Sequence, residues 1–192
     1  MAESKINAAT TALVAIDLQH GIVAMKTAPY ESADVVKRTK LIADALRARG
    51  GTVVLVRVHN SADGRDALAP LTDTPAPVSA VRAPNWSQLV PELGVQDGDI
   101  VITKRQWGAF YGTDLELHLR RRGIRTIIMT GIATHIGVES TARDAYERGF
   151  DQIFVEDATS SPNEEAHKAS FKLIFPRIGC IRSSEQVLGD LG

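Results

Sequence analysis

Two charged side chains of opposite sign stand at the ends of apolar runs, where they could handle protons. Asp17 closes the run T-A-L-V-A-I-D, and Lys104 follows the apolar stretch 99–103. An acid after a strand is often only a turn former, and a lysine there is usually solvated. If the fold brings both into one desolvated cleft, each shifts the proton affinity of the other. The pair is therefore a candidate for acid–base chemistry.

A third stretch, residues 130–150, changes its pattern abruptly. The apolar run 124–129 breaks at Gly131, and from Gly137 the apolar positions follow helical spacing. A strand that turns sharply into a helix leaves backbone N–H groups without partners, and the helix dipole favours negative charge there. We therefore expect the active site here, at the carboxyl end of a strand. His135 could be a base or a ligand, although a lone histidine beside an apolar run is more often structural.

Four aromatic residues could wall a small-molecule pocket or simply belong to the core: Trp86, Trp107, Phe110 and Tyr111. The histidines lack zinc-binding spacing, and the single cysteine, Cys180, excludes an internal disulfide and a cysteine cluster. We expect no metal and no cofactor. The G-x-S-x-G, Walker and G-x-G-x-x-G motifs are also missing from the sequence, so serine-hydrolase and nucleotide-binding functions lack support.

The elements that must position these residues alternate along the chain. Apolar runs predict strands, and the segments between them carry helix caps and glycine stops. The alternation predicts one α/β domain over residues 1–192, with a doubly wound, six-stranded, mainly parallel sheet and helices on both faces. The predicted strands are 11–17, 52–58, 99–103, 124–129, 152–155 and 178–181, and the predicted helices start near Ser32 or Asp34, Thr113 or Asp114, Gly137, and Ser161 or Asn163.

The segment from Asn60 to Asp99 has a different character. It holds five of the eight prolines and shows no long periodicity. We interpret it as an extended excursion with short helical turns around residues 86–93. Long irregular insertions in compact domains usually carry function or make subunit contacts.

Composition places the chain among ordinary globular proteins. Of its 192 residues, 44% are hydrophobic and 23% charged, and the formal net charge is -1. The absence of a basic patch argues against nucleic acid as a partner. No apolar run approaches the roughly 20 residues that span a bilayer, and the N-terminus is short and polar. We expect a cytoplasmic protein that does not bind membranes.

Three motifs together resemble the isochorismatase-like hydrolases. They are A-I-D-L-Q at 15–19, K-R-Q-W-G-A-F-Y-G-T-D-L at 104–115 and G-I-A-T-H-I-G-V-E-S-T-A-R-D-A at 131–145. The match runs in order over nearly the whole chain. The residues around Trp107 and Val138, with I-F-P-R-I-G near the C-terminus, resemble the YecD-type branch.

The resemblance implies an altered catalytic triad. Most members are amidases with an Asp–Lys–Cys triad, and Asp17 and Lys104 match the first two positions. The cysteine position falls on Gly137, in T-H-I-G-V, so no covalent thioester can form there. Cys180 lies near the end of the chain and is no obvious substitute.

True isochorismatases also lack this nucleophile and cleave a vinyl ether, releasing pyruvate. By resemblance, Asp17 would supply the proton. The resemblance also implies a cis peptide at Ile132–Ala133, with the N–H groups of Ala133 and Gly137 directed at the ligand. We further expect Gln19, Thr134, His135 and the four aromatic residues to contact substrate.

The resulting hypothesis is a cysteine-independent hydrolase of a small carboxylated metabolite, with Asp17 as acid or base. Two alternatives stay open. One is a non-catalytic small-molecule binder that kept the fold. The other is a cysteine-free amidase in which Asp17 activates water. We also expect self-association into a dimer or tetramer.

Overall fold

The computed structural model describes residues 6–74 and 82–192, and its centre is one sheet of six strands in the order β3-β2-β1-β4-β5-β6. Every neighbouring pair is parallel. This confirms the predicted doubly wound α/β class. The strands are β1 (Thr11–Ile16), β2 (Thr52–Val58), β3 (Ile100–Lys104), β4 (Thr126–Ile132), β5 (Asp151–Ser160) and β6 (Cys180–Arg182).

Strand β1 is buried at all six positions, as expected for a central strand covered on both faces. Successive side chains alternate between two cores. Ala12, Val14 and Ile16 pack in one apolar cluster, and Leu13 and Ala15 pack in the other. The continuous apolar run in the sequence therefore reflects a strand between two helical layers.

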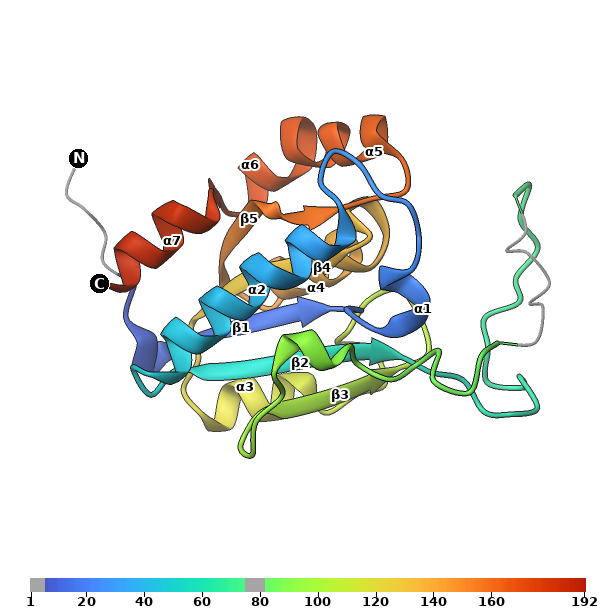
Figure 1. Cartoon of the computed structure of the whole chain (residues 1–192), viewed down its shortest axis with the longest axis horizontal. Helices are drawn as coiled ribbons and strands as arrows, with labels where there is room; N and C mark the ends of the chain where they lie inside the picture. The colour runs from blue at the N-terminus through green and yellow to red at the C-terminus, as the bar shows by residue number, and fades with distance from the viewer. Residues whose placement is uncertain (1–5, 75–81) are drawn as a thin grey trace.

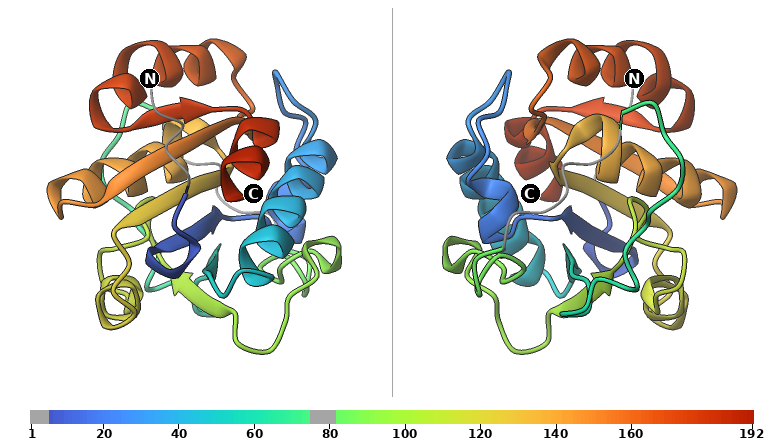
Figure 2. Two further views of the ribbon diagram at one scale, coloured as in Figure 1. Left: turned by 90° about the vertical axis from the view of Figure 1, so that its left-hand side faces the viewer. Right: turned by 90° about the vertical axis from the view of Figure 1, so that its right-hand side faces the viewer.

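The helices divide between the two faces of the sheet (Figures 1 and 2). Helices α2 and α7 contribute to the core that contains Leu13, and α3, α4 and α6 contribute to the core that contains Val14. The helices are α1 (His20–Val23), α2 (Ser32–Arg47), α3 (Leu115–Arg121), α4 (Glu139–Glu147), α5 (Glu164–Ala169), α6 (Phe175–Ile178) and α7 (Ser184–Leu191). Single helical turns lie at Ala8–Thr10, Thr134–Val138, Ser170–Ile174 and Pro91–Leu93.

All six predicted strands are present. The second has the predicted first and last residues, and each of the others differs from its prediction at one end or both. Strand β5 is much longer than predicted because it continues past Glu156 and Asp157 to Ser160. Helix α7 was not predicted. It begins with a capping box in which Ser183 and Gln186 each bond the backbone of the other.

The described part of the excursion, residues 60–74 and 82–99, extends from the carboxyl end of β2 (Figure 1). Its one short helix is the turn Pro91–Leu93, within the predicted range. Residues 75–81, with Pro75 and Pro77, lie outside the described part of the chain.

The strand order places a topological switch point between β1 and β4. Ligands of open α/β sheets bind outside the carboxyl ends of strands at such a point. At this end Gly131, with φ +120°, pairs with Ile16. The fold therefore predicts a ligand site formed by the residues that follow β1 and β4.

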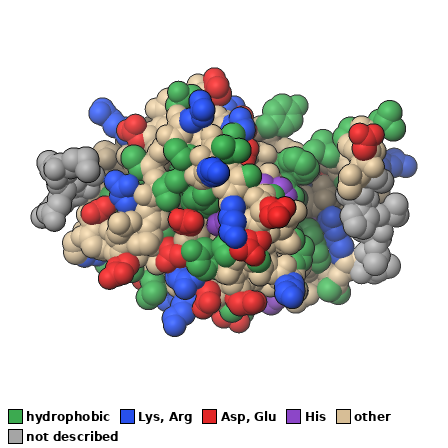
Figure 3. Space-filling view, turned by 90° about the horizontal axis from the view of Figure 1, so that it is seen from above, with side chains coloured by type: hydrophobic (Ala, Val, Ile, Leu, Met, Phe, Trp, Pro, Cys, Tyr) green, Lys and Arg blue, Asp and Glu red, His purple; other side chains and the backbone are tan. Residues whose placement is uncertain are grey.

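The surface seen in Figure 3 mixes acidic and basic side chains, with no large patch of one sign on that face. Among the described residues, none of the helices combines the length and apolar character needed to cross a membrane.

Candidate active site

Asp17 follows β1 directly and has φ +55°, a conformation that aspartate tolerates better than most residues. Its N–H donates to the carbonyl of Val56 at 2.9 Å, and its carbonyl accepts from the N–H of Gln19 at 2.8 Å. These bonds end the strand and hold the carboxylate at the carboxyl end of β1. The side chain is 9% exposed.

Lys104 is the last residue of β3, and β2 lies between it and Asp17. Its side chain is 1% exposed, and its ammonium lies 2.8 Å from Asp17 Oδ2. The ammonium also donates to the carbonyl of Trp107 at 2.6 Å. The structure thus brings the two predicted charged residues together in a buried ion pair.

Burial and the ion pair act on Asp17 in opposite directions. Removal from water raises the pKa of Asp17, the charge and hydrogen bond of Lys104 lower it, and the net pKa is about 6. Burial has the larger effect. The other carboxylate oxygen, Oδ1, is buried and has no hydrogen-bond partner among the described residues. Asp17 is therefore a carboxyl group that can carry a proton near neutral pH.

Gly137 lies against this pair, in the turn Thr134–Val138 that precedes α4. A side chain here would place its Cβ 3.1 Å from Asp17 Oδ2, 3.1 Å from Lys104 Nζ and 3.0 Å from a methyl group of Ile16. Such contacts are tighter than ordinary packing. A side chain at this position would require the ion pair or Ile16 to shift by a few tenths of an ångström.

The turn before Gly137 contains the predicted cis peptide, Ile132–Ala133. The carbonyl of Ala133 accepts from the N–H groups of Ile136 and Val138. Among the described residues, no backbone bond outside the regular elements uses the N–H of Ala133.

A cavity of about 380 Å³ opens above the ion pair. Asp17, Lys104, Ala133 and Gly137 line it, as do the predicted aromatic residues Trp86 and Trp107. The described excursion supplies much of the remaining wall. The other lining residues are Ile22, Met25, Val58, Asn60, Ala67, Leu68, Arg82, Arg105, Gln106, Ile132, Ile136 and Pro162.

Sequence reasoning missed four polar residues of this wall: Asn60, Arg82, Arg105 and Gln106. The Arg82 guanidinium lies 4.0 Å from the Trp86 ring centroid and donates to Asn60 Oδ1 at 3.2 Å. Asn60 Nδ2 is buried without a hydrogen-bond partner among the described residues. The position of Asn60 just past β2 is a weak signal for a site, but Arg82 lies in an irregular segment and carries none.

Three predicted substrate contacts are instead tied into the protein interior. The Gln19 amide donates to the carbonyls of Val58 and Trp86 and accepts from the N–H of Val58, so it anchors the excursion. The Thr134 hydroxyl lies 3.0 Å from the carbonyl of Ser160 and 2.8 Å from His167 Nδ1. The ring of Phe110 is buried in the core.

Two further predicted contacts also lie away from the described cavity wall. His135 Nδ1 bonds the Ser161 hydroxyl at 2.8 Å, and burial lowers the pKa of this histidine. Tyr111 is 76% exposed. Within residues 6–74 and 82–192, no three histidine, cysteine, aspartate or glutamate side chains gather as a metal site.

Nearly the whole chain is similar to proteins of one family. Residues 11–186 match the isochorismatase domain. The uncharacterized isochorismatase family protein YwoC of Bacillus subtilis (strain 168) is 52% identical over 179 residues, covering 93% of this chain and 92% of YwoC. YecD of Escherichia coli O157:H7 is 52% identical over 187 residues, covering 97% and 99%. The structure of a Burkholderia thailandensis isochorismatase family protein matches with TM-score 0.92 at 47% identity, covering 95% and 96%.

Proposed function

Because the chain belongs to the isochorismatase family of hydrolases, we propose that it hydrolyses a small carboxylated metabolite without a cysteine nucleophile. Asp17 acts as the proton donor, and the scissile bond is that of a vinyl ether. The N–H groups of Ala133 and Gly137 bind substrate oxygen.

One observation carries this proposal: the carboxyl group at the cavity floor has a raised pKa and an unpartnered oxygen. Asp17 Oδ2 is occupied by Lys104, whereas Oδ1 is buried and unbonded among the described residues. A proton on Oδ1 can be transferred to a substrate atom within hydrogen-bond reach. At position 137, where a nucleophile would stand, there is no side chain.

The reaction balances with water as the only co-reactant. Asp17 gives its proton to the methylene carbon of the vinyl ether, and the neighbouring carbon becomes an oxocarbenium centre. Water adds to that carbon and returns one proton to Asp17. The hemiketal then breaks its C–O bond, its hydroxyl proton passes to the departing alcohol, and a 2-keto acid remains when the vinyl group bears a carboxylate.

Lys104 assists the transfer by stabilising the carboxylate that Asp17 becomes. Its ammonium is already 2.8 Å from Oδ2, so no rearrangement is needed when the negative charge forms. The carbonyl of Trp107 also accepts a hydrogen bond from the ammonium and helps to hold it in place. Burial keeps a fraction of Asp17 protonated near neutral pH, and the lysine stabilises the carboxylate that remains after the transfer.

The cavity wall supports a carboxylate on the substrate. Of the two arginines that line it, Arg105 pairs with Asp66 at 2.7 Å, whereas no described carboxylate pairs with Arg82. Asn60 Nδ2, which has no hydrogen-bond partner among the described residues, adds a second donor. Two such donors on one wall suit an anionic oxygen.

The direct test measures pyruvate release from isochorismate and related carboxylated enol ethers, using the parent and the Cys180→Ser variant. We expect turnover at equal rates, because Cys180 is the only cysteine and β6 begins with it, away from the carboxyl strand ends. Ligand-induced thermal stabilisation without turnover would favour a non-catalytic binder. Hydrolysis of amides but not of enol ethers would favour the cysteine-free amidase.

The pH dependence reveals the role of Asp17. A proton donor works in its protonated form, and that fraction falls as pH rises through the pKa of about 6. We expect kcat/KM to decrease above about pH 6, approaching tenfold per pH unit. A rate that instead rises across this range would show that the ionised carboxylate is the active form.

Arg82→Gln is expected to weaken binding of carboxylated substrates. Loss of a charge-assisted bond of about 1.5–3 kcal/mol should raise KM roughly 10- to 100-fold, with kcat changed little. Comparing each acid with its methyl ester isolates the effect, since the variant should lose the parent's preference for the acid. Arg65→Gln is the matched control, because that exposed arginine pairs only with Asp63 among the described residues. An unchanged preference in Arg82→Gln would contradict the assignment.

A further inference from the structure

The loop that holds the Lys104 ammonium has few bonds of its own to the sheet. This segment, residues 105–114, is called here the Lys104 loop. It runs from β3 to α3, and its carbonyl at Trp107 is the second partner of the ammonium besides Asp17. Any drift of the loop would therefore move the ammonium relative to the carboxyl group.

One hydroxyl joins this loop to the other half of the site. Thr141 Oγ1, on α4, accepts the N–H of Ala109 at 3.1 Å and donates to the carbonyl of Gly137 at 2.6 Å. The side chain is fully buried. A single hydroxyl group thus spans the loop beside Lys104 and the turn beside Asp17.

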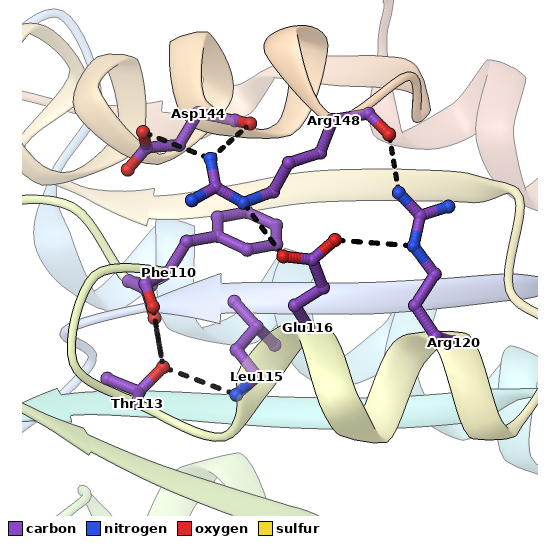
Figure 4. A network of polar contacts seen from close by, with 8 residues as sticks. Phe110, Thr113, Leu115, Glu116, Arg120, Asp144 and Arg148 are labelled. Carbon is purple, nitrogen blue, oxygen red and sulfur yellow. Dashed lines mark hydrogen bonds and ion pairs between the residues drawn. The ribbon is translucent and has the colours of Figure 1, made fainter.

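The loop and α4 are in close contact around this bond. A Cβ at Gly108 would lie 2.8 Å from a carboxylate oxygen of Asp144, so the loop backbone nearly touches the helix. Figure 4 shows the next part of the contact, where Arg148 bonds Asp144 and Glu116 and lies over the ring of Phe110. The network fixes Phe110, and Thr141 fixes Ala109 next to it.

We propose that Thr141 is a positioning residue that sets the Lys104 ammonium against Asp17 by holding the Lys104 loop to the Gly137 turn. Thr141 does not line the cavity among the described residues and touches no substrate. It acts through the loop, and the kinetic part of its test rests on the proposed function.

The test compares Thr141→Val, which keeps the shape and removes the hydroxyl, with Thr141→Ser, which keeps the hydroxyl. Thr39→Val is the matched control, because Thr39 is also fully buried on a helix but its hydroxyl has no partner among the described residues. The measurements are amide hydrogen exchange at Ala109, the titration of Asp17 by carbon-13 NMR, and turnover of the carboxylated enol ethers.

In Thr141→Val we expect exchange at Ala109 to be at least about tenfold faster, because its N–H loses its acceptor. The pKa of Asp17 should rise further, since the opposing Lys104 becomes less closely held. A small misplacement of the pair should lower kcat about 10- to 100-fold with KM nearly unchanged. Thr141→Ser and Thr39→Val should match the parent in all three measurements.

Parental exchange and titration in Thr141→Val would overturn the inference, as would a Thr141→Ser variant that behaves like Thr141→Val. If Thr141→Val does not fold, Thr141→Ala is measured in the same way. Absence of turnover in the parent would count against the proposed function alone, because the exchange and titration measurements decide the role of Thr141 without any substrate.

Discussion

Replacement of Asp17 by asparagine is expected to lower kcat/KM for carboxylated enol ethers by about 10²- to 10⁴-fold, the range for loss of a general acid. Asparagine has nearly the same shape but cannot give up a proton at the same position. The variant should still bind substrate, because Arg82, Asn60 and the backbone donors of the cavity are untouched. Steady-state kinetics and ligand-induced thermal stabilisation separate the two effects.

The control for this experiment is Asp99→Asn. Asp99 also has a buried carboxylate, which pairs with Arg47 at 2.7 Å, but it precedes β3 at the opposite end of the strand from Lys104. Asp17→Asn leaves the buried Lys104 ammonium without its carboxylate, which costs about 3–5 kcal/mol of stability. Asp99→Asn removes one carboxylate of a similar pair but should cost less, because Arg47 keeps Asp44 at 2.7 Å. Only Asp17→Asn should also lose turnover. Equal loss in both variants, or undiminished turnover in Asp17→Asn, would remove Asp17 from the mechanism.

If Asp17→Asn folds poorly, the double variant Asp17→Asn/Lys104→Met removes both charges. The double variant avoids the unpaired buried cation that Asp17→Asn leaves, so it should be more stable than the single variant. A folded but active double variant would contradict the proposed role of the pair.

Gly131→Ala is expected to destabilise the protein by about 4 kcal/mol or prevent folding. Its Cβ would lie 2.1 Å from the carbonyl oxygen of Ile16, and its φ of +120° disfavours any side chain. Neither Gly131 nor Ile16 can move away freely, because their backbones are paired in the adjacent central strands β4 and β1. For a chain of this size we expect the melting temperature to fall by about 8–16 °C.

Gly149→Ala is the matched control for Gly131→Ala. Gly149 also has a positive φ, +73°, but nothing lies within 4 Å of its Cβ position. The backbone conformation alone should cost about 1–2 kcal/mol. If Gly131→Ala lowers the melting temperature no more than Gly149→Ala, the close approach of β1 and β4 does not constrain the switch point as described.

The two residues of the ion pair could be found from the sequence because each stands at the end of a predicted strand. Parallel strands end at one edge of the sheet, so Asp17 at the end of 11–17 and Lys104 just after 99–103 were expected to share that edge. The pattern does not say whether β3 lies near β1. In the structure β2 lies between β1 and β3. The lysine side chain is long enough to reach past β2, so that its ammonium lies 2.8 Å from Asp17 Oδ2.

The wall of the cavity beside Asp17 was predicted less well because residue type does not tell which way a side chain faces. Trp107 and Phe110 are three positions apart in one loop, yet one lines the cavity and the other packs in the core. Gln19 lies two positions after Asp17, but its side-chain amide makes its hydrogen bonds to backbone groups of β2 and the excursion.

The sequence by itself determined the α/β fold, the position of Asp17 and Lys104 at strand ends, and the presence of glycine rather than cysteine at position 137. These follow from local patterns and from single residue types. Only the tertiary structure decided that burial raises the pKa of Asp17 by more than Lys104 lowers it. It also decided that Arg82 and Asn60 line the same cavity. The burial of Asp17 and the meeting of these side chains at one cavity depend on how distant segments of the chain pack together. No local sequence pattern predicts that packing.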